Sequence, residues 1–223
     1  MKKIIVFITV LTTMFWSCSD DLDFEPRNEL TLETFFASEG DALAAINGVY
    51  LYFNGNHTIN KGVHWYFARR AGQMSDDANG DAASFTNGNL GAGDNIVEGI
   101  WTDAYRTIRL SNIVIENIDR PDMDETLRDR IRAEATFFRA FSYYLLAFNY
   151  GDVPYIDKAL TIDEVKVGKT PKATVIANIL ADLEAAATDL PISYGASDTG
   201  RITKGAALGL KAKVLLYNEN YTF

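Results

Sequence analysis

The chain has 223 residues, of which 48% are hydrophobic and 12% aromatic, which is enough apolar material for a sizeable core. Its formal net charge is −9, from 21 basic and 30 acidic residues, and the basic residues form no stripe along the sequence. Because phosphate neutralisation supplies most of the affinity for nucleic acids, this acidic composition excludes nucleic acid as a partner.

Residues 1–17 read as an export signal. Lys2 and Lys3 precede the apolar run "IIVFITVLTTMF", which is too short to span a bilayer as a stable anchor. The sole cysteine, Cys18, follows, so an internal disulfide is excluded. Cys18 is either a leftover thiol or the acylated cysteine of a lipobox that becomes the mature N-terminus. We favour lipidation, given the charged start and the apolar run.

Residues 18–30 are then expected to form a lipidated acidic tether. Acyl chains on Cys18 would attach the chain to a membrane, since each buried CH₂ contributes about 0.8 kcal/mol. The acidic run from Asp20 to Glu25 is either a flexible spacer or a sorting signal for the cell surface.

From residue 31 to residue 223 the hydrophobic spacing predicts one helical domain. Gly40 is expected to interrupt the first helix, with the longer segment starting at Asp41. Asp94 is placed to cap a helix whose apolar face runs to Ile115. A further helix starts after Pro121 and stops at Gly151.

The last two helices follow an extended link with weak β character. Thr170 is the expected N-cap of the first of them, with Pro171 at its first position. The last helix, within residues 202–221, is expected to turn small Ala and Gly residues toward a partner. Helices joined by short turns indicate an all-α fold of stacked antiparallel hairpins, similar to tetratricopeptide repeats but without their strict 34-residue signature.

The stretch "FFRAFSYYLLAFNYGDVPY" (Phe137–Tyr155) holds eight aromatic rings. Their helical spacing gives a wide apolar face, which is typical of a helix buried between neighbours and not of a platform for a flat ligand. Arg132, Glu134 and Arg139 are expected to form a polar strip beside this face.

The sequence offers no positive sign of catalysis, of a cofactor or of a metal site. His57 and His64 have no nucleophile or orienting acid tied to them by a motif. The acidic run Asp76–Asp81 fails as an EF-hand loop, because Ala82 stands where glycine is needed and Gly88 where a bidentate glutamate is needed. A looser oxygen-ligand site there stays open.

A long polar segment between the first two long helices is the candidate ligand-binding region, since long loops in compact domains are commonly functional. Aromatic faces stack on sugar rings, and amides and carboxylates bind hydroxyls. The alternative is that the aromatics pack on the helices and the asparagines form turns. The candidate ligand-binding residues are Trp65, Asp77, Asn79, Asp81, Phe85, Asn87 and Asn89.

The segment "RAEATFFRAFSYYLLAFNYGDVPY" resembles the signature of the SusD/RagB family, an Arg-Ala-Glu, aromatic-rich helix that closes on Gly-Asp-Val-Pro. The resemblance covers essentially the whole chain. It includes five further segments in order: "CSDDLDFEP", "DALAAINGVY", "IWTDAYRTIRLSNIVIENI", "ILADLEAAATDLP" and "GRITKGAALGLKAKVLLY".

This resemblance implies a non-enzymatic, glycan-binding outer-membrane lipoprotein of Bacteroidetes-type bacteria that is built on tetratricopeptide-like helix pairs. It would act with a TonB-dependent transporter (SusC-like) and deliver oligosaccharides or other nutrients. The acidic run after Cys18 resembles the family's surface-export signal. By position, the family's ligand loop corresponds to Asp76–Asn89.

The family's members are much longer, so we expect a truncated N-terminal half with exposed apolar helix faces that favour association. The competing interpretations are a helical-repeat adaptor for proteins or peptides, a non-functional fragment, and an enzyme with an unrecognised carboxylate pair.

Overall fold

The computed structural model describes residues 35–55, 62–63, 91 and 93–218. All of them except Phe35 belong to one compact unit, Phe36–Phe223. The only β-pairing in this part of the chain is an isolated antiparallel bridge between Val153 and Thr170, so the predicted all-α fold is confirmed. The elements are α3 (Glu39–Asn54), α6 (Asn95–Asn117), α7 (Glu125–Tyr150), η2 (Ile162–Glu164), α8 (Lys172–Asp189), η3 (Ala196–Asp198) and α9 (Lys204–Tyr217).

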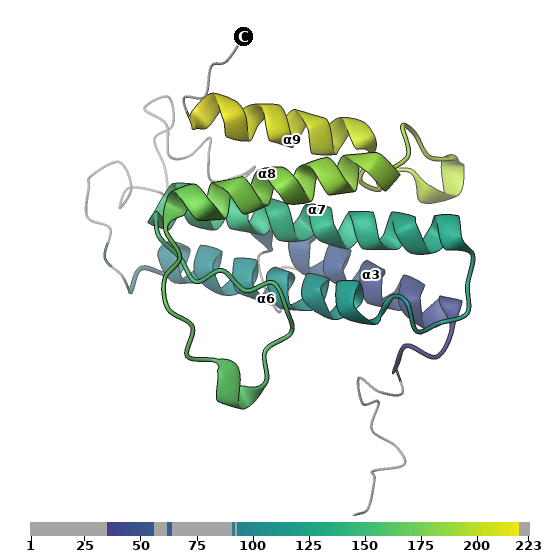
Figure 1. The fold of residues 1–223 in the computed structure, drawn as a ribbon, viewed down its shortest axis with the longest axis horizontal. Helices are drawn as coiled ribbons and strands as arrows, with labels where there is room; N and C mark the ends of the chain where they lie inside the picture. Colours follow the sequence, from purple (N-terminus) through teal and green to yellow (C-terminus); the bar gives the residue numbers. More distant parts are fainter. Residues whose placement is uncertain (1–34, 56–61, 64–90, 92, 219–223) are drawn as a thin grey trace, which may run out of the picture. The chain divides into compact units, whose positions relative to one another are not determined.

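Helix α7 is the centre of this unit (Figure 1). It packs along α6 and α8, and it also contacts α3 and α9. The connections between α6, α7, α8 and α9 alternate between the two ends of the helices, which gives the expected antiparallel hairpins. Within the described residues, none of the helices has both the length and the hydropathy that crossing a membrane requires.

The helix ends follow local capping chemistry. Ser38 caps α3 and forms a reciprocal capping box with Asp41, so Gly40 lies inside the first turn and the predicted break at Gly40 is wrong. Asp94 caps α6 as predicted, with its side chain accepting from the N–H of Ile96 at 2.9 Å. Gly151 ends α7 with a φ of 78°, which glycine adopts without strain.

The predicted start of α8 is displaced by one residue. Pro171 is the N-cap and the helix begins at Lys172. Thr170 does not cap it, because its N–H and C=O pair with the backbone of Val153 in the isolated bridge. The weak β character expected for this link is therefore confined to one pair of residues.

The aromatic-rich stretch forms the core, as predicted. Phe138 and Tyr143 are fully buried, and the ring centroid of Phe138 lies 4.6 Å from that of Tyr50 and 4.7 Å from that of Phe53 on α3. The expected polar strip is partly wrong, because Glu134 is 0% exposed and lies inside the protein.

On α9 the small residues divide between two environments. Ala207 is buried, whereas Gly205 and Gly209 are exposed. Leu208 and Leu216 on α9 are 46% and 56% exposed.

Candidate functional site

The ligand-binding residues predicted from the sequence lie outside the described residues, as does Cys18. The structure brings none of them together and separates none of them, so they remain predictions. The residues concerned are Trp65, Asp77, Asn79, Asp81, Phe85, Asn87 and Asn89.

The structure does show an anchor just before that segment. The N–H of Gly62 donates to the buried Asp103 carboxylate of α6 at 3.1 Å, and Val63 is 1% exposed. Gly62 has a φ of 76°, and a Cβ there would lie 2.3 Å from the nitrogen of Gly55. Glycine is therefore required where the chain that leaves α3 reaches α6.

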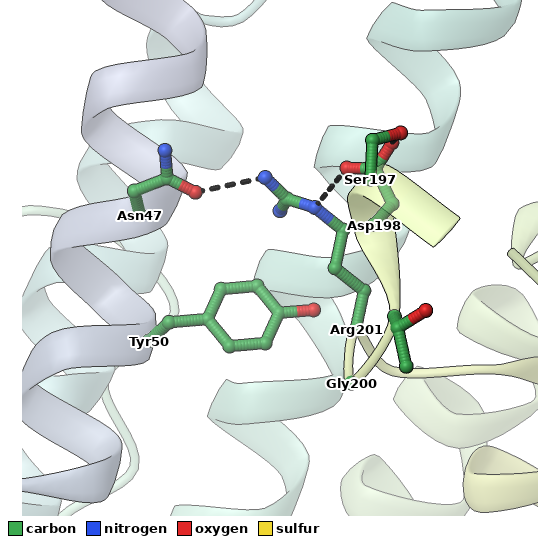
Figure 2. Close-up of a pocket in the computed structure, with 7 residues that line it drawn as sticks. Asn47, Tyr50, Ser197, Asp198, Gly200 and Arg201 are labelled. Atoms are coloured by element: carbon green, nitrogen blue, oxygen red, sulfur yellow. Dashed lines mark hydrogen bonds and ion pairs between the residues drawn. The ribbon is translucent and has the colours of Figure 1, made fainter. Parts of the chain in front are cut away.

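A solvent-open hollow of about 260 Å³ lies between α3 and the connection from α8 to α9 (Figure 2). We call it the Arg201 hollow. Its lining combines an amide, three hydroxyl groups, of which one is on a tyrosine ring, a carboxylate and a guanidinium. The lining residues are Asn47, Tyr50, Ser197, Asp198, Thr199, Gly200 and Arg201.

Arg201 connects three parts of the chain. Its NH2 donates to Oδ1 of Asn47 on α3 at 2.9 Å, and its Nε donates to Oδ1 of Asp198 in η3 at 2.7 Å (Figure 2). Its NH1 donates to Oε2 of Glu134 on α7 at 3.0 Å. Three charge-assisted or polar hydrogen bonds therefore fix the guanidinium in one position.

Glu134 is the buried charge behind this hollow. The hydroxyl of Tyr194 lies 3.1 Å from its Oε1, and the guanidinium Nε of Arg130 lies 3.7 Å from the same atom. Burial raises the pKa of Glu134, while the nearby Arg201 and Arg130 act to lower it. A carboxylate removed from water in this way is costly unless its partners stay in place.

The backbone of the α8–α9 connection is held by tyrosines. The hydroxyl of Tyr50 accepts from the N–H of Ile202 at 2.9 Å, and the hydroxyl of Tyr194 lies 2.9 Å from the carbonyl oxygen of Ile202. The turn itself uses Gly200, whose φ is 98° and whose missing Cβ would face open space. The connection is thus a fixed wall of the hollow.

A second hollow, of about 160 Å³, lies between α6 and the segment that follows α7. The buried Asn112 shapes it, because its Nδ2 donates to the carbonyl oxygens of Ile156 and Lys158 at 3.0 and 3.1 Å. Its lining is mainly aliphatic, with cationic groups among the side chains: Tyr105, Ile108, Arg109, Ile156, Lys158, Leu160 and Val165.

The Arg201 hollow is suited to hydrogen bonding and not to proton transfer. The hydrogen bond from Arg201 is the main reason that the pKa of Asp198 lies below its usual value, so this carboxyl stays ionised and accepts hydrogen bonds. The described part of the chain contains no cluster of three His, Cys, Asp or Glu residues that could hold a metal ion.

Sequence reasoning missed this network because its members lie far apart along the chain. Arg201 bonds to residues 67 and 154 positions away. One signal was present: Glu134 precedes the buried Phe138 by one helical turn, so it occupies an apolar face. A charged residue at such a position indicates a buried ion pair.

The comparisons with known proteins agree with the fold. Residues 22–216 match a SusD-like family model described as starch-binding and associating with the outer membrane. SusD-like protein P2 of Formosa agariphila is 34% identical over 198 residues, which cover 86% of this chain and 39% of that protein. SusD-like protein P25 of the same organism is 28% identical over 233 residues, which cover 99% of this chain and 44% of that protein.

Solved structures give the same picture. A SusD-like carbohydrate-binding protein from Bacteroides fragilis superposes with a TM-score of 0.71 at 25% identity, covering 84% of this chain and 39% of that one. A laminarin-binding SusD-like protein gives a TM-score of 0.70 at 25% identity, and the match covers 83% of this chain and 41% of that one. The chain spans about two-fifths of the length of the curated relatives it matches. It belongs to the SusD-like family of carbohydrate-binding proteins.

Proposed function

We propose that this protein is a lipid-anchored, cell-surface glycan-binding protein that works with a TonB-dependent outer-membrane transporter in oligosaccharide uptake. The observation that carries the proposal is the family match over residues 22–216, whose description combines starch binding with the outer membrane. The laminarin-binding neighbour supports a glycan as the ligand. Because SusD-like proteins bind carbohydrate without catalysis, the protein is proposed to be a binder and not an enzyme.

The proposed main ligand site is the Asp76–Asn89 stretch together with Trp65. Phe85 would stack on a sugar ring, and the amide and carboxylate groups around it would bind hydroxyls. The anchor at Gly62 supports this assignment, because the bond to Asp103 fixes the chain three residues before Trp65 and 14 residues before Asp76. A fixed entry point reduces the ordering cost of a ligand-binding loop.

Affinity electrophoresis in gels that contain laminarin tests the glycan-binding proposal. The unaltered protein is expected to be retarded relative to a polysaccharide-free gel, and Phe85→Ala and Trp65→Ala are each expected to reduce the retardation. Ile192→Ala is the matched control, since Ile192 is 85% exposed and lies in the α8–α9 connection outside the Arg201 hollow. If both variants were retarded as strongly as the unaltered protein, the site assignment would be wrong. If the unaltered protein bound no neutral glycan, the proposed function would be wrong.

The membrane arm of the proposal is tested separately. Expressed with its residues 1–17 in a Bacteroidetes host, the protein is expected to incorporate labelled palmitate and to fractionate with the outer membrane, and Cys18→Ser is expected to do neither. A tagged copy is expected to co-purify a TonB-dependent transporter from the same membranes. Palmitate incorporation in Cys18→Ser would contradict the lipidation site, and isolation of the tagged protein without a transporter would contradict the partnership.

A further inference from the structure

We propose that the Arg201 hollow binds one neutral sugar ring of the glycan, as a contact additional to the Asp76–Asn89 stretch. This inference rests on the proposed glycan-binding function. It concerns residues that the sequence did not single out, on α3 and on the α8–α9 connection (Figure 2).

The charge balance at the hollow selects a neutral ligand. Two guanidinium groups and two carboxylates meet there: Arg201 bonds to Glu134 and Asp198, and Arg130 NH1 lies 3.8 Å from Asp198 Oδ1. Among the described residues, each of these two cations is therefore paired with an anion. A uronate or sulfate group would meet no unpaired cation among them, and it would have to approach Asp198, whose side chain is 35% exposed. Unpaired or repelled charge in a partly desolvated site opposes binding.

The polar atoms left over suit hydroxyl groups. Oδ1 of Asn47 is taken by Arg201, and among the described residues its Nδ2 has no acceptor. The hydroxyl of Ser197 donates to Oδ2 of Asp198 at 3.3 Å, which leaves the oxygen of Ser197 able to accept. Nδ2 of Asn47 can thus donate, while the oxygen of Ser197 and the carboxylate of Asp198 can accept. A sugar hydroxyl both donates and accepts, so it can satisfy either side.

The hollow is of a size to hold one sugar ring, and its rigidity favours binding. Its volume of about 260 Å³ falls just below the range of about 300–1,000 Å³ that is typical of sites for drug-sized ligands. Its walls are held from three directions by the hydrogen bonds of Arg201 to α3, α7 and η3. Binding groups that are already ordered lose little conformational entropy when a ligand arrives.

Titration calorimetry on the full chain tests the proposal, with laminarihexaose as the neutral probe and a galacturonate hexamer as the anionic probe. Asn47→Asp keeps an acceptor for Arg201 and removes the Nδ2 donor, and Ser197→Ala removes the hydroxyl. Each is expected to weaken laminarihexaose binding about three- to tenfold, as the loss of one hydrogen bond does. The unaltered protein is expected to bind the galacturonate at least about tenfold more weakly.

Matched controls separate binding from folding. Asn149→Asp makes the same chemical change 15 residues, about 22 Å, from Glu134 along α7, where it removes the bond from Nδ2 of Asn149 to the carbonyl oxygen of Leu145, and it is expected to bind normally. Thermal unfolding is expected to show Ser197→Ala as stable as the unaltered protein, because Ser197 is exposed and bonds only to the adjacent Asp198. Laminarihexaose is also expected to slow hydrogen exchange in residues 196–202.

The outcomes distinguish this inference from the proposed function. Normal binding by both hollow variants, unchanged exchange in residues 196–202 and loss of binding in Phe85→Ala would overturn the inference and leave the glycan-binding function standing. Tighter binding of the galacturonate would overturn the neutral-ligand argument. Absence of glycan binding by the unaltered protein would overturn the function and the inference together.

Discussion

Replacing Glu134 with alanine is expected to lower the free energy of unfolding by about 3–5 kcal/mol, which is the usual cost of removing one partner from a buried ion pair. The side chain of Glu134 is 0% exposed, and those of Arg201 and Arg130 are only 15% and 17% exposed. Alanine would leave both guanidinium groups without this carboxylate and would leave a cavity. Because the free energy of unfolding of a domain is typically about 5–15 kcal/mol, Glu134→Ala would remove a large part of the protein's stability.

Removing the other partner adds a pH dependence. Burial raises the pKa of Glu134 above its usual value of 4.5, and Arg201 is the largest influence that lowers it again. In Arg201→Met the folded-state pKa should therefore rise further. The folded state then holds a proton that the unfolded state has released, so stability falls as the pH rises from about 4.5 through the folded pKa. The penalty of Arg201→Met should therefore be larger at pH 8 than at pH 5.

Urea-induced unfolding at pH 5 and pH 8, followed by circular dichroism, measures both effects. Glu134→Gln in the Arg201→Met background is expected to abolish the extra pH dependence, since no ionisable group remains at position 134. Glu98→Ala is the surface control, because Glu98 is exposed on α6, and it should change stability by no more than about 0.5 kcal/mol. A cost below about 1 kcal/mol for Glu134→Ala, or an Arg201→Met penalty that is independent of pH, would refute the buried-pair reasoning.

Three further predictions concern other parts of the fold. Asn112→Ala removes one of the two donors to the carbonyl of Ile156, which keeps the Tyr143 hydroxyl at 3.0 Å, and frees the carbonyl of Lys158, so it should cost about 1–3 kcal/mol and speed hydrogen exchange in residues 155–160; unchanged exchange would contradict it. Gly209→Ala should raise the free energy of unfolding by about 1 kcal/mol and the Tm by about 2–4 °C, because its Cβ meets nothing within 4 Å, and a lower Tm would contradict this. Burial raises the pKa of Tyr155 to about 12 from 10.0, so stability should fall as the pH rises above 10, and the ultraviolet absorbance difference between the unaltered protein and Tyr155→Phe should show this tyrosinate forming late; a difference that titrates near pH 10 in the folded protein would count against it.

The helices could be predicted from the sequence because each is specified by neighbours along the chain. Asp94 lies next to the helix that it caps, and Gly151 ends α7 with the left-handed conformation that glycine permits. The two errors at helix starts have a similar cause. The capping box of Ser38 and Asp41 starts α3 before Gly40, so this glycine does not interrupt the helix. The backbone of Thr170 pairs with Val153, so Pro171 takes the N-cap position.

The Arg201 hollow could not be predicted, because it depends on tertiary packing. Asn47, Glu134 and Arg201 lie in three different parts of the chain, and no local sequence pattern predicts that α3, α7 and the α8–α9 connection pack together. The position of Glu134 on an apolar helical face did indicate a buried charge, yet its partners lay beyond the reach of sequence spacing. The ligand residues proposed from the loop composition stay predictions, since they lie outside the described residues.

The segment after α7 shows where the chain could accept foreign sequence. Its course from Pro154 to Leu160 is set by side chains of α6 and α7, among them Tyr105, Arg109 and Asn112, which bond to its carbonyl oxygens. Beyond it, residues 161–169 project away from the helices as a loop that carries η2 (Figure 1). We call this loop the excursion, and Ile162 near its start is 86% exposed. The pairing of Val153 with Thr170 closes the base of this excursion. The helices hold the base, and of the tip Val165 lines the second hollow together with α6. With Val165 kept, an epitope or a fluorophore site could therefore be placed within residues 162–168 while the bundle and the Arg201 hollow stay intact.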